Sequence, residues 1–408
     1  GSEFDSIIFD KYDDSLRWGG FTFNDVSHDT EFRYVRISGA ENNGLYLYYS
    51  NPILDNVTIS NNMGYYGGGV DMFGSSPILN NVTISNNMAE TSGGGMYLLE
   101  SNPTLNNIII TNNMGYYGGG MFIKSSNPTL NNVTISNNTA DWGGGIFLEY
   151  SNPTLNHMTI SGNIAEQGAG GISSYESNPV LTRVTIVNNR AVEGGGMLLT
   201  SSYPILTNSI IWGNNPEYIY IYYDYFNYNI SEPIITYSNI QGGWEGEGNI
   251  DTDPLFIDPE NGNYKLQASS PCIDTGTAFF EIDSLGVILE LDESEYYGVA
   301  PDMGAHEYNS LSIHMPIVLS PTKYLLEYPY PNPFNPTTLI SYVLPVETEV
   351  KIEIYNINGE LMNTLQNGVK TPGYHSIEWN ASGFSSGVYF VKLHTEEFTQ
   401  IQKLSLIK

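Results

Sequence analysis

Cysteine is almost absent from the sequence, since Cys272 is the only one in 408 residues. A single cysteine excludes an intrachain disulfide and a zinc site built from cysteines, so packing has to stabilise the fold. Basic residues are also scarce: 14 Lys and Arg stand against 44 Asp and Glu, and the formal net charge is −30. This charge repels phosphate backbones and anionic lipids, which argues against nucleic acid and membrane surfaces as partners.

Long hydrophobic runs and helical periodicity are missing as well. No apolar run reaches the roughly 18 residues that suggest a membrane-spanning helix, and no segment shows the apolar spacing of an amphipathic helix. Residues 1–4 (GSEF) are typical of a cloning scar. The chain is longer than a usual single domain, so we expect two or more cores unless a solenoid runs long as one unit.

What the sequence does contain is a repeat of 25 or 26 residues. Each repeat has a proline, a leucine two residues later, an isoleucine seven residues later and an asparagine ten residues later. The prolines are Pro52, Pro77, Pro103, Pro128, Pro153, Pro179 and Pro204. A Gly-rich step then leads to a second apolar pair, such as Met96 and Leu98. Alternation with period two, interrupted by Gly, Asn and Pro, is typical of short β-strands.

Such a repeat cannot bury its own apolar face, but coils stacked about 4.8 Å apart turn every position into a column. Helical repeats do not fit, and propeller blades need about 40 residues or more. The sequence therefore predicts an all-β fold whose body is a parallel β-helix with about 25 residues per coil.

The recurring asparagine has a specific role in this prediction. Stacked amides can donate to the next coil and accept from the previous one, which satisfies groups that would cost about 1–3 kcal/mol if buried unpaired. The expected ladder consists of Asn62, Asn87, Asn113, Asn138, Asn163, Asn189 and Asn214. Glycine triplets begin at Gly67, Gly93, Gly118, Gly143 and Gly194. We expect positive φ at these tight corners, where a Cβ would clash.

The coils over about residues 6–240 resemble the right-handed parallel β-helix repeat family, and the segments NNMGYYGGGV and NNTADWGGGIF are also similar to bacterial polymorphic outer-membrane proteins. Residues 248–258 (GNIDTDPLFID) through 301–308 (PDMGAHEY) resemble the closing module of bacterial surface β-helix proteins of the variable anchoring type. These resemblances imply coils over residues 5–240 and a loop-rich cap over residues 241–308.

The composition changes near residue 328. YPNPFNPTT opens the segment at residue 330, VKIEIY at 350–355 alternates like a half-buried strand, and Asn358 with Gly359 supplies a hairpin turn. Together with GFSSGVYFVKL at 383–393 and KLSLIK at 403–408, this pattern resembles the C-terminal sorting domain of type IX secretion. About 80 residues in short strands fit a small Ig-like sandwich.

The sorting-domain resemblance implies secretion machinery as the partner of residues 328–408, and a secreted or cell-surface location outside a Gram-negative-type outer membrane. Residues 309–327 are then expected to be a linker. An accessory sandwich without a sorting role is the alternative.

Two columns are expected to point outward from the coils. The inward pair Met96 and Leu98 leaves Tyr97 outward, and the same register gives a first column of Tyr46, Asp71, Tyr97, Phe122, Phe147, Ser173 and Leu198. The second column contains Tyr48, Phe73, Leu99, Lys124, Glu149, Tyr175 and Thr200. Because large exposed apolar patches usually mark binding sites, Tyr46, Tyr97, Phe122, Phe147 and Tyr175 are candidates for a platform on which sugars stack. Alternatively, another segment or another copy covers this face.

Lys124 and Glu149 are expected to form a cross-strand ion pair. His157 and Arg183 replace asparagine on adjacent coils. A polysaccharide lyase needs a base and a positive charge, which these two residues could supply, but two solvated substitutions on a turn are favoured.

Metal candidates are acidic residues in loops. Asp141 and Glu166 share a column, where they either diverge into water or share a Ca²⁺ ion. Asp251, Asp253 and Asp258 in the cap either bind Ca²⁺ or form Asx turns.

The repeats are too uniform for a deep pocket, and basic residues are too few for a polyuronate cleft. The sequence thus favours a non-catalytic surface module that binds glycans or mediates adhesion, and a polysaccharide lyase or glycoside hydrolase is the alternative.

Overall fold

The computed structural model of the protein describes residues 6–10, 18–216, 218–222, 230–309, 324–326, 329, 332–346, 348–371 and 373–407. The chain divides into two compact units, Gly1–Tyr308 and Asn309–Lys408. The expected cloning scar, residues 1–4, lies outside the described residues, as does most of the expected linker. No helix in the described part is long and apolar enough to cross a membrane.

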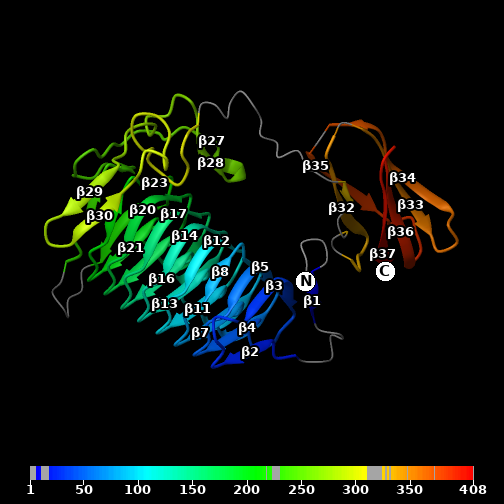
Figure 1. Cartoon of the computed structure of the whole chain (residues 1–408), viewed down its shortest axis with the longest axis horizontal. Helices are drawn as coiled ribbons and strands as arrows, with labels where there is room; N and C mark the ends of the chain where they lie inside the picture. Colours follow the sequence, from blue (N-terminus) through cyan, green and yellow to red (C-terminus); the bar gives the residue numbers. More distant parts are fainter. Residues whose placement is uncertain are drawn as a thin grey trace. The chain divides into compact units, whose positions relative to one another are not determined.

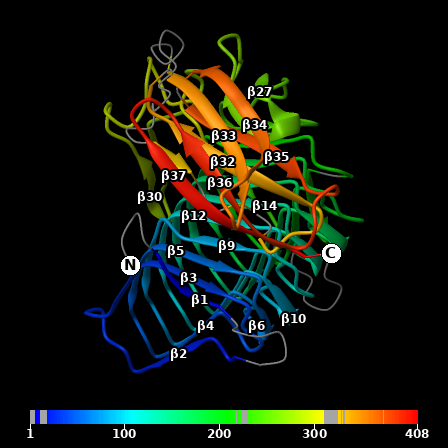
Figure 2. The ribbon, with the colours of Figure 1, turned by 90° about the vertical axis from the view of Figure 1, so that its right-hand side faces the viewer.

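The first unit is a parallel β-helix, which confirms the predicted fold (Figure 1). A thirteen-strand sheet contains β1 (Ile7–Phe9), β3 (Glu31–Ser38), β5 (Ile53–Ser60), β8 (Ile78–Asn80), β9 (Thr83–Ser85), β12 (Thr104–Thr111), β14 (Thr129–Ser136), β17 (Thr154–Ser161), β20 (Val180–Val187), β22 (Ile205–Thr207), β23 (Ile210–Trp212), β25 (Ile234–Thr236) and β26 (Asn239–Ile240). Figure 2 shows the first of these strands, β1, β3 and β5, from another side.

A nine-strand sheet forms a second wall of the coils. It contains β2 (Phe21–Asn24), β4 (Leu45–Tyr48), β7 (Val70–Phe73), β11 (Met96–Leu99), β13 (Met121–Lys124), β16 (Ile146–Glu149), β19 (Ile172–Tyr175), β21 (Met197–Thr200) and β24 (Ile219–Tyr222). At the corners, β6 (Met63–Tyr66) pairs with β10 (Met88–Ser92), and β15 (Thr139–Trp142) pairs with β18 (Ile164–Gly168).

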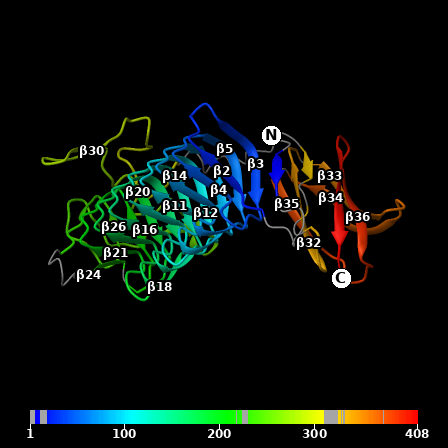
Figure 3. The ribbon, with the colours of Figure 1, turned by 90° about the horizontal axis from the view of Figure 1, so that it is seen from below.

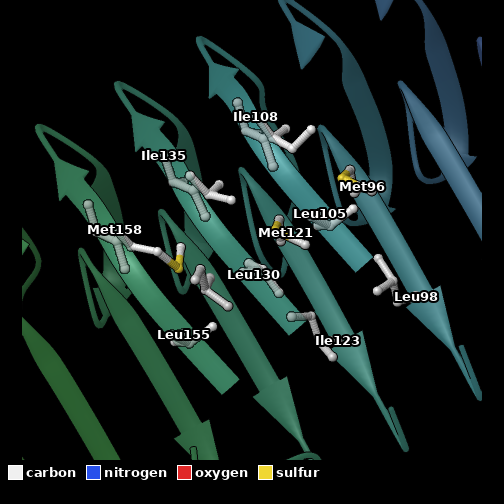
Figure 4. Close-up of a cluster of buried hydrophobic side chains, with 14 of the residues drawn as sticks. Met96, Leu98, Leu105, Ile108, Met121, Ile123, Leu130, Ile135, Leu155 and Met158 are labelled. Atoms are coloured by element: carbon white, nitrogen blue, oxygen red, sulfur yellow. The ribbon is translucent and has the colours of Figure 1, made fainter. Parts of the chain in front are cut away.

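The register places like residues of successive coils side by side, as the repeat predicts. Leu105 pairs with Leu130, and Ile110 pairs with Ile135. Figure 4 shows how apolar side chains from β11 and β13 lie opposite those from β12, β14 and β17. Burial of these columns is the main source of stability in a fold without disulfides.

The buried asparagines form the ladder that the sequence predicts. Asn113 Nδ2 donates to Asn138 Oδ1 at 3.0 Å, and Asn138 Nδ2 donates to Asn163 Oδ1 at 2.9 Å. The second hydrogen of Asn138 Nδ2 reaches the carbonyl of Ile110 at 3.0 Å, so the buried amide has no unused donor. The first glycine of each triplet has positive φ, from 54° at Gly67 to 69° at Gly93.

Sequence reasoning missed a second buried ladder made of serines. Each stands two residues before a repeat proline, and its backbone N–H donates to the serine hydroxyl of the next coil, as from Ser101 to Ser126 at 2.9 Å and from Ser126 to Ser151 at 3.1 Å. The unbroken spacing of serine and proline was the signal that could have revealed it.

Residues that follow the last coils pack against the outside of the thirteen-strand sheet. They form β27 (Phe256–Asp258), the 3-10 helix η1 (Pro259–Asn261), β28 (Asn263–Leu266), β29 (Phe279–Ile282) and β30 (Gly286–Glu290). Phe256, Tyr264 and Met303 share a small core with Val187 and Ile210 of the coils. The β29–β30 hairpin projects away from the coils (Figure 3). We call residues 241–308 the closing segment.

The second unit has two antiparallel sheets around its own core. One sheet contains β31 (Leu325–Leu326), β32 (Thr337–Leu344) and β35 (Gly373–Asn380). The other contains β33 (Thr348–Asn356), β34 (Leu361–Lys370), β36 (Gly387–His394) and β37 (Thr399–Leu406). Trp379 and Ile352, one from each sheet, are both buried in this core, as expected for a sandwich.

Candidate functional site

Both predicted outward columns exist on the nine-strand sheet. Tyr97 of β11 pairs with Asp71 of β7 and with Phe122 of β13, and Phe122 pairs with Phe147 of β16. In the second column Lys124 pairs with Leu99 and Glu149. The alternation of strand side chains puts these residues on the face away from the core.

The aromatic rings of the first column stack on one another. The ring centroids of Tyr97 and Phe122 are 5.3 Å apart with an interplanar angle of 7°, and those of Phe122 and Phe147 are 5.4 Å apart at 14°. Phe122 is consequently only 5% exposed. The expectation of an exposed aromatic platform is wrong here, because the coil spacing lets each ring cover the face of its neighbour.

The same column is also buried farther along the coils. Ser173 and Leu198 are 3% and 4% exposed. A Cβ added at Gly168 would lie 2.7 Å from Leu198 Cδ1 and 2.7 Å from the ring of Trp142, so the corner segment folds over the column there. The expectation that Ser173 and Leu198 point into solvent is therefore wrong too.

Two tyrosines from the corners flank the stack, and sequence reasoning had not placed them at the site. The Tyr66 ring lies 4.8 Å from that of Tyr97, and the Tyr117 ring lies 5.2 Å from that of Phe147 in a T-shaped arrangement. Both belong to the segment GYYGGG, which occurs at residues 64–69 and 115–120. This shared motif was the available signal.

Together these side chains line a groove of about 400 Å³, which we call the aromatic groove. Its walls include the rings of Tyr66, Tyr97, Tyr117, Phe122, Phe147 and Tyr175. The expected ion pair of Lys124 and Glu149 also lines it, with Nζ and Oε1 2.8 Å apart. Tyr46 lies in the same column, with its ring 6.3 Å from that of Tyr48, and does not line the groove.

Burial changes the acid–base properties of the groove. It raises the pKa of the Tyr97 hydroxyl to about 12, with the nearby charges of Asp71 and Glu149 adding to the effect. Burial, with hydrogen bonding to Tyr150, raises the pKa of Tyr175 to about 12. At neutral pH both hydroxyls therefore stay protonated and can donate hydrogen bonds.

Asp71 lies in the first column between Tyr46 and Tyr97. Burial raises the pKa of its carboxyl group from 3.8 to about 7. No side-chain hydrogen bond to Asp71 is found within the described part of the chain, which agrees with burial as the cause.

His157 and Arg183 are close together, but they are not both solvated. Arg183 is 2% exposed, so the favoured expectation of two solvated turn residues is wrong for Arg183. Its Nη1 lies 2.6 Å from His157 Nε2 and donates to the carbonyl of Glu295 at 3.1 Å. Both residues have positive φ, 51° and 54°, like the asparagines whose column they share. Asparagine tolerates this conformation well, which is why it fills the column elsewhere.

The closing segment surrounds Arg183 with acidic groups. Burial and the charge of Asp302 raise the pKa of Glu307 to about 7, while Arg183 opposes that rise. Burial and the charge of Arg183 lower the pKa of His157 to about 4. Arg183 Nε and Nη2 are buried without a hydrogen-bond partner among the described residues. Arg183 is therefore buried beneath the closing segment, where the Glu295 carbonyl accepts one of its hydrogen bonds.

The metal candidates do not assemble into a binding cluster. The described residues contain no group of three or more His, Cys, Asp or Glu that could hold a metal ion. The strands that carry Asp141 and Glu166 shift register next to these residues. The acids of the closing segment accept local hydrogen bonds instead: Asp253 from the N–H of Leu255 at 2.9 Å, Asp258 from Asn261 Nδ2 at 2.9 Å, and Asp251 from the N–H of Gly242 at 3.2 Å. Such contacts are typical of turns.

Comparison with known protein families gives separate matches for the β-helix unit and for the second unit. Residues 19–172 match the model of a right handed beta helix region, and residues 329–408 match that of a secretion system C-terminal sorting domain. Residues 116–248 also match the model of a periplasmic copper-binding protein (NosD). No curated protein matches the chain.

Among solved structures, the enzymatically active domain of bacteriophage CBA120 tailspike protein 2 matches at 9% identity and a TM-score of 0.20, with 92% of this chain and 68% of that chain covered. A likeness at this TM-score carries no argument about function. The same architecture is indicated by the sequence repeat, by the stacked parallel strands and by the family matches over residues 19–172 and 329–408. The chain is a secreted or cell-surface right-handed parallel β-helix protein that ends in a type IX sorting domain.

Proposed function

We propose that the β-helix is a non-catalytic module that binds glycans or mediates adhesion at the cell surface, and that the aromatic groove holds the ligand. The observation that carries this proposal is the combination of aromatic walls, protonated tyrosine hydroxyls and an ion pair in one concave site. Pockets that bind small molecules are mostly apolar with a few placed polar groups. Sugars offer both apolar ring faces and hydroxyl groups to such a site.

The ring faces of the central stack are already used, so the sugar would meet ring edges and the two flanking tyrosines. Tyr66 is 39% exposed, whereas Phe122 is 5% exposed. Lys124 and Glu149 supply a donor and an acceptor side by side, which suits a pair of neighbouring sugar hydroxyls.

Charge favours a neutral glycan. Of the 14 basic and 44 acidic residues, 8 and 36 lie in residues 1–308, which gives this part a formal net charge of −28. A body of this charge repels polyuronates and other acidic polymers. We therefore propose a neutral β-linked polysaccharide as the ligand.

A lyase or hydrolase is the enzymatic alternative, with His157 and Arg183 as its residues. The two side chains are in contact, as residues of one catalytic site would be, but the burial of Arg183 does not favour this alternative. We further propose that the sorting domain directs the protein to the outer-membrane surface.

Retention on insoluble neutral polysaccharides tests the proposal. The double substitution Lys124→Met and Glu149→Leu removes the pair without leaving an unpaired charge. We expect it to abolish retention, whereas Arg33→Met with Glu31→Leu, which removes an exposed pair at 3.1 Å, should leave retention unchanged. Equal retention of both variants would contradict binding in the groove. Release of unsaturated products from polygalacturonate that disappears in His157→Ala would instead favour the lyase.

A further inference from the structure

A second concave site lies on the other wall of the coils, away from the aromatic groove. It is a cavity of about 500 Å³ between β14 and β17 of the thirteen-strand sheet and the hairpin that contains η1 in the closing segment. We propose that this cavity, which we call the hydroxyl pocket, is a binding site for a neutral oligosaccharide. The volume lies within the range of about 300–1,000 Å³ typical of small-molecule sites.

The sheet contributes four hydroxyl groups to the pocket, and that of Ser136 on β14 donates to Thr111 Oγ1 at 3.1 Å. The other three belong to Thr134 of β14 and to Thr159 and Ser161 of β17. Thr159 and Ser161 are 7% and 6% exposed. No side-chain hydrogen bond from any of the three hydroxyls is found within the described residues. The oxygen atoms of these three groups stay accessible from the cavity, so they can bond with a ligand or with water there.

The neighbouring coil shows what the sheet does where the closing segment packs directly on it. Thr185 stands beside Thr159 in the register, and its Oγ1 accepts a hydrogen bond from the N–H of Ala305 at 2.9 Å. Val187 stands beside Ser161 and is buried in the small core of the closing segment. Beside the paired Ser136, the cavity is therefore lined by three hydroxyls that make no side-chain hydrogen bond among the described residues. Where the two surfaces touch, the corresponding side chains are paired or apolar.

The closing segment supplies the complementary side of the pocket. Tyr264 contributes an aromatic ring, and His306 an imidazole. Burial lowers the pKa of His306, as does the nearby charge of Lys265, so the ring is neutral at pH 7 and offers one donor and one acceptor. Asn261 adds an amide, and Glu260 a carboxylate.

This set of groups selects the class of ligand. Hydroxyls, an amide, a neutral imidazole and one aromatic ring match the hydroxyl groups and apolar faces of a sugar. Among the described residues neither Lys nor Arg lines the pocket, and residues 251–308 carry thirteen acidic residues against Lys265 as their only Lys or Arg. A carboxylate or phosphate ligand would meet repulsion, so the ligand is uncharged.

Calorimetric titration with soluble neutral oligosaccharides of glucose, mannose and xylose tests the inference, with an oligogalacturonate as the anionic comparison. The double substitution Thr159→Val and Ser161→Ala removes two hydroxyls at nearly constant shape, and we expect at least about a tenfold loss of affinity for the neutral sugar. The matched control is Thr58→Val with Ser60→Ala, the same motif on β5 outside the pocket, which should keep the parent affinity.

The same titrations are repeated in the background of Lys124→Met with Glu149→Leu, which disables the aromatic groove. If this background variant still binds the neutral sugar, and binding is lost once Thr159→Val and Ser161→Ala are added, the hydroxyl pocket is supported. This holds even if the proposed role of the aromatic groove fails. The inference is overturned if the aromatic-groove variant binds none of the neutral sugars. It is likewise overturned if the pocket variant and the β5 control bind equally well, or if the oligogalacturonate binds more tightly than the neutral sugars.

Discussion

Asparagine has two different roles in each coil. The ladder asparagines are buried and bond to one another, whereas the asparagines of the column that includes Asn132 take positive φ, 54° in that case, and are exposed except for Asn208. The first role depends on the side-chain amide, and the second on the backbone conformation that asparagine tolerates. Positions of the same residue type therefore respond differently to substitution.

Asn138→Ala tests the ladder. The substitution removes the oxygen that accepts from the backbone N–H and Nδ2 of Asn113, and it removes the side-chain donor to Asn163 Oδ1, so we expect the free energy of unfolding to fall by about 1–3 kcal/mol. Urea denaturation measures this change. Thr134→Val, an outward substitution in the same coil, should cost much less, and equal stabilities of Asn138→Ala and the parent would show that the ladder bonds contribute nothing.

The closing segment depends on its attachment to β17 and β20. Arg183 is the only Lys or Arg between Asp141 and Arg190, and burial lowers its pKa while the charges of nearby acidic residues of this segment raise it. Breaking a buried charge interaction by removing one partner is usually destabilising, by about 3–5 kcal/mol for a full pair. Asparagine at this position restores the residue type of the column and so removes the charge without adding backbone strain.

Arg183→Asn should therefore destabilise the protein in a pH-dependent way. Because the folded pKa of Glu307 is raised above its ordinary 4.5 to about 7, stability falls as pH rises through this interval, and loss of Arg183 raises that pKa further. We expect a small deficit at pH 5 and a loss of about 2 kcal/mol at pH 8. Urea unfolding at the two pH values measures it.

His157→Asn is the matched control for this prediction. Because the pKa of His157 is lowered from 6.5 to about 4 in the folded protein, its protonation in the unfolded chain costs stability at pH 5 but not at pH 8. His157→Asn should therefore gain stability at pH 5 relative to the parent and lose little at pH 8, the pH at which Arg183→Asn is expected to lose about 2 kcal/mol. A deficit for Arg183→Asn that is the same at pH 5 and pH 8 would mean that the acidic groups of the closing segment do not sense Arg183.

At the scale of the whole molecule, the two units have separate cores. A repeat protein is stabilised by contacts between neighbouring coils, and its closing segment covers the last of them here. The charge is also divided unequally, since residues 309–408 contain 6 of the 14 basic residues but only 8 of the 44 acidic ones.

A chain that ends at Tyr308 should consequently fold without the sorting domain. We expect it to stay soluble, with the circular dichroism spectrum of a β-protein and an unfolding temperature close to that of the first unit in the full chain. Aggregation of the truncated chain, or a loss of its β spectrum, would show that the first unit needs the second for folding.

The sequence by itself determined the columns of this protein. A strict repeat places Leu on Leu and Asn on Asn once parallel coils stack, so the core, the ladder and the outward register follow from spacing alone. The sorting domain was equally visible because its motifs lie close together in the sequence.

Only the tertiary structure decided which outward residues are accessible and what they contact. Phe122 is covered by the rings of adjacent coils, Arg183 by the closing segment, and the hydroxyls of Thr159 and Ser161 by a hairpin about a hundred residues away. Periodicity predicts the direction of a side chain, whereas its exposure depends on non-repeating segments that fold back from distant positions. For this reason the β-helix was predictable, and its two concave sites were not.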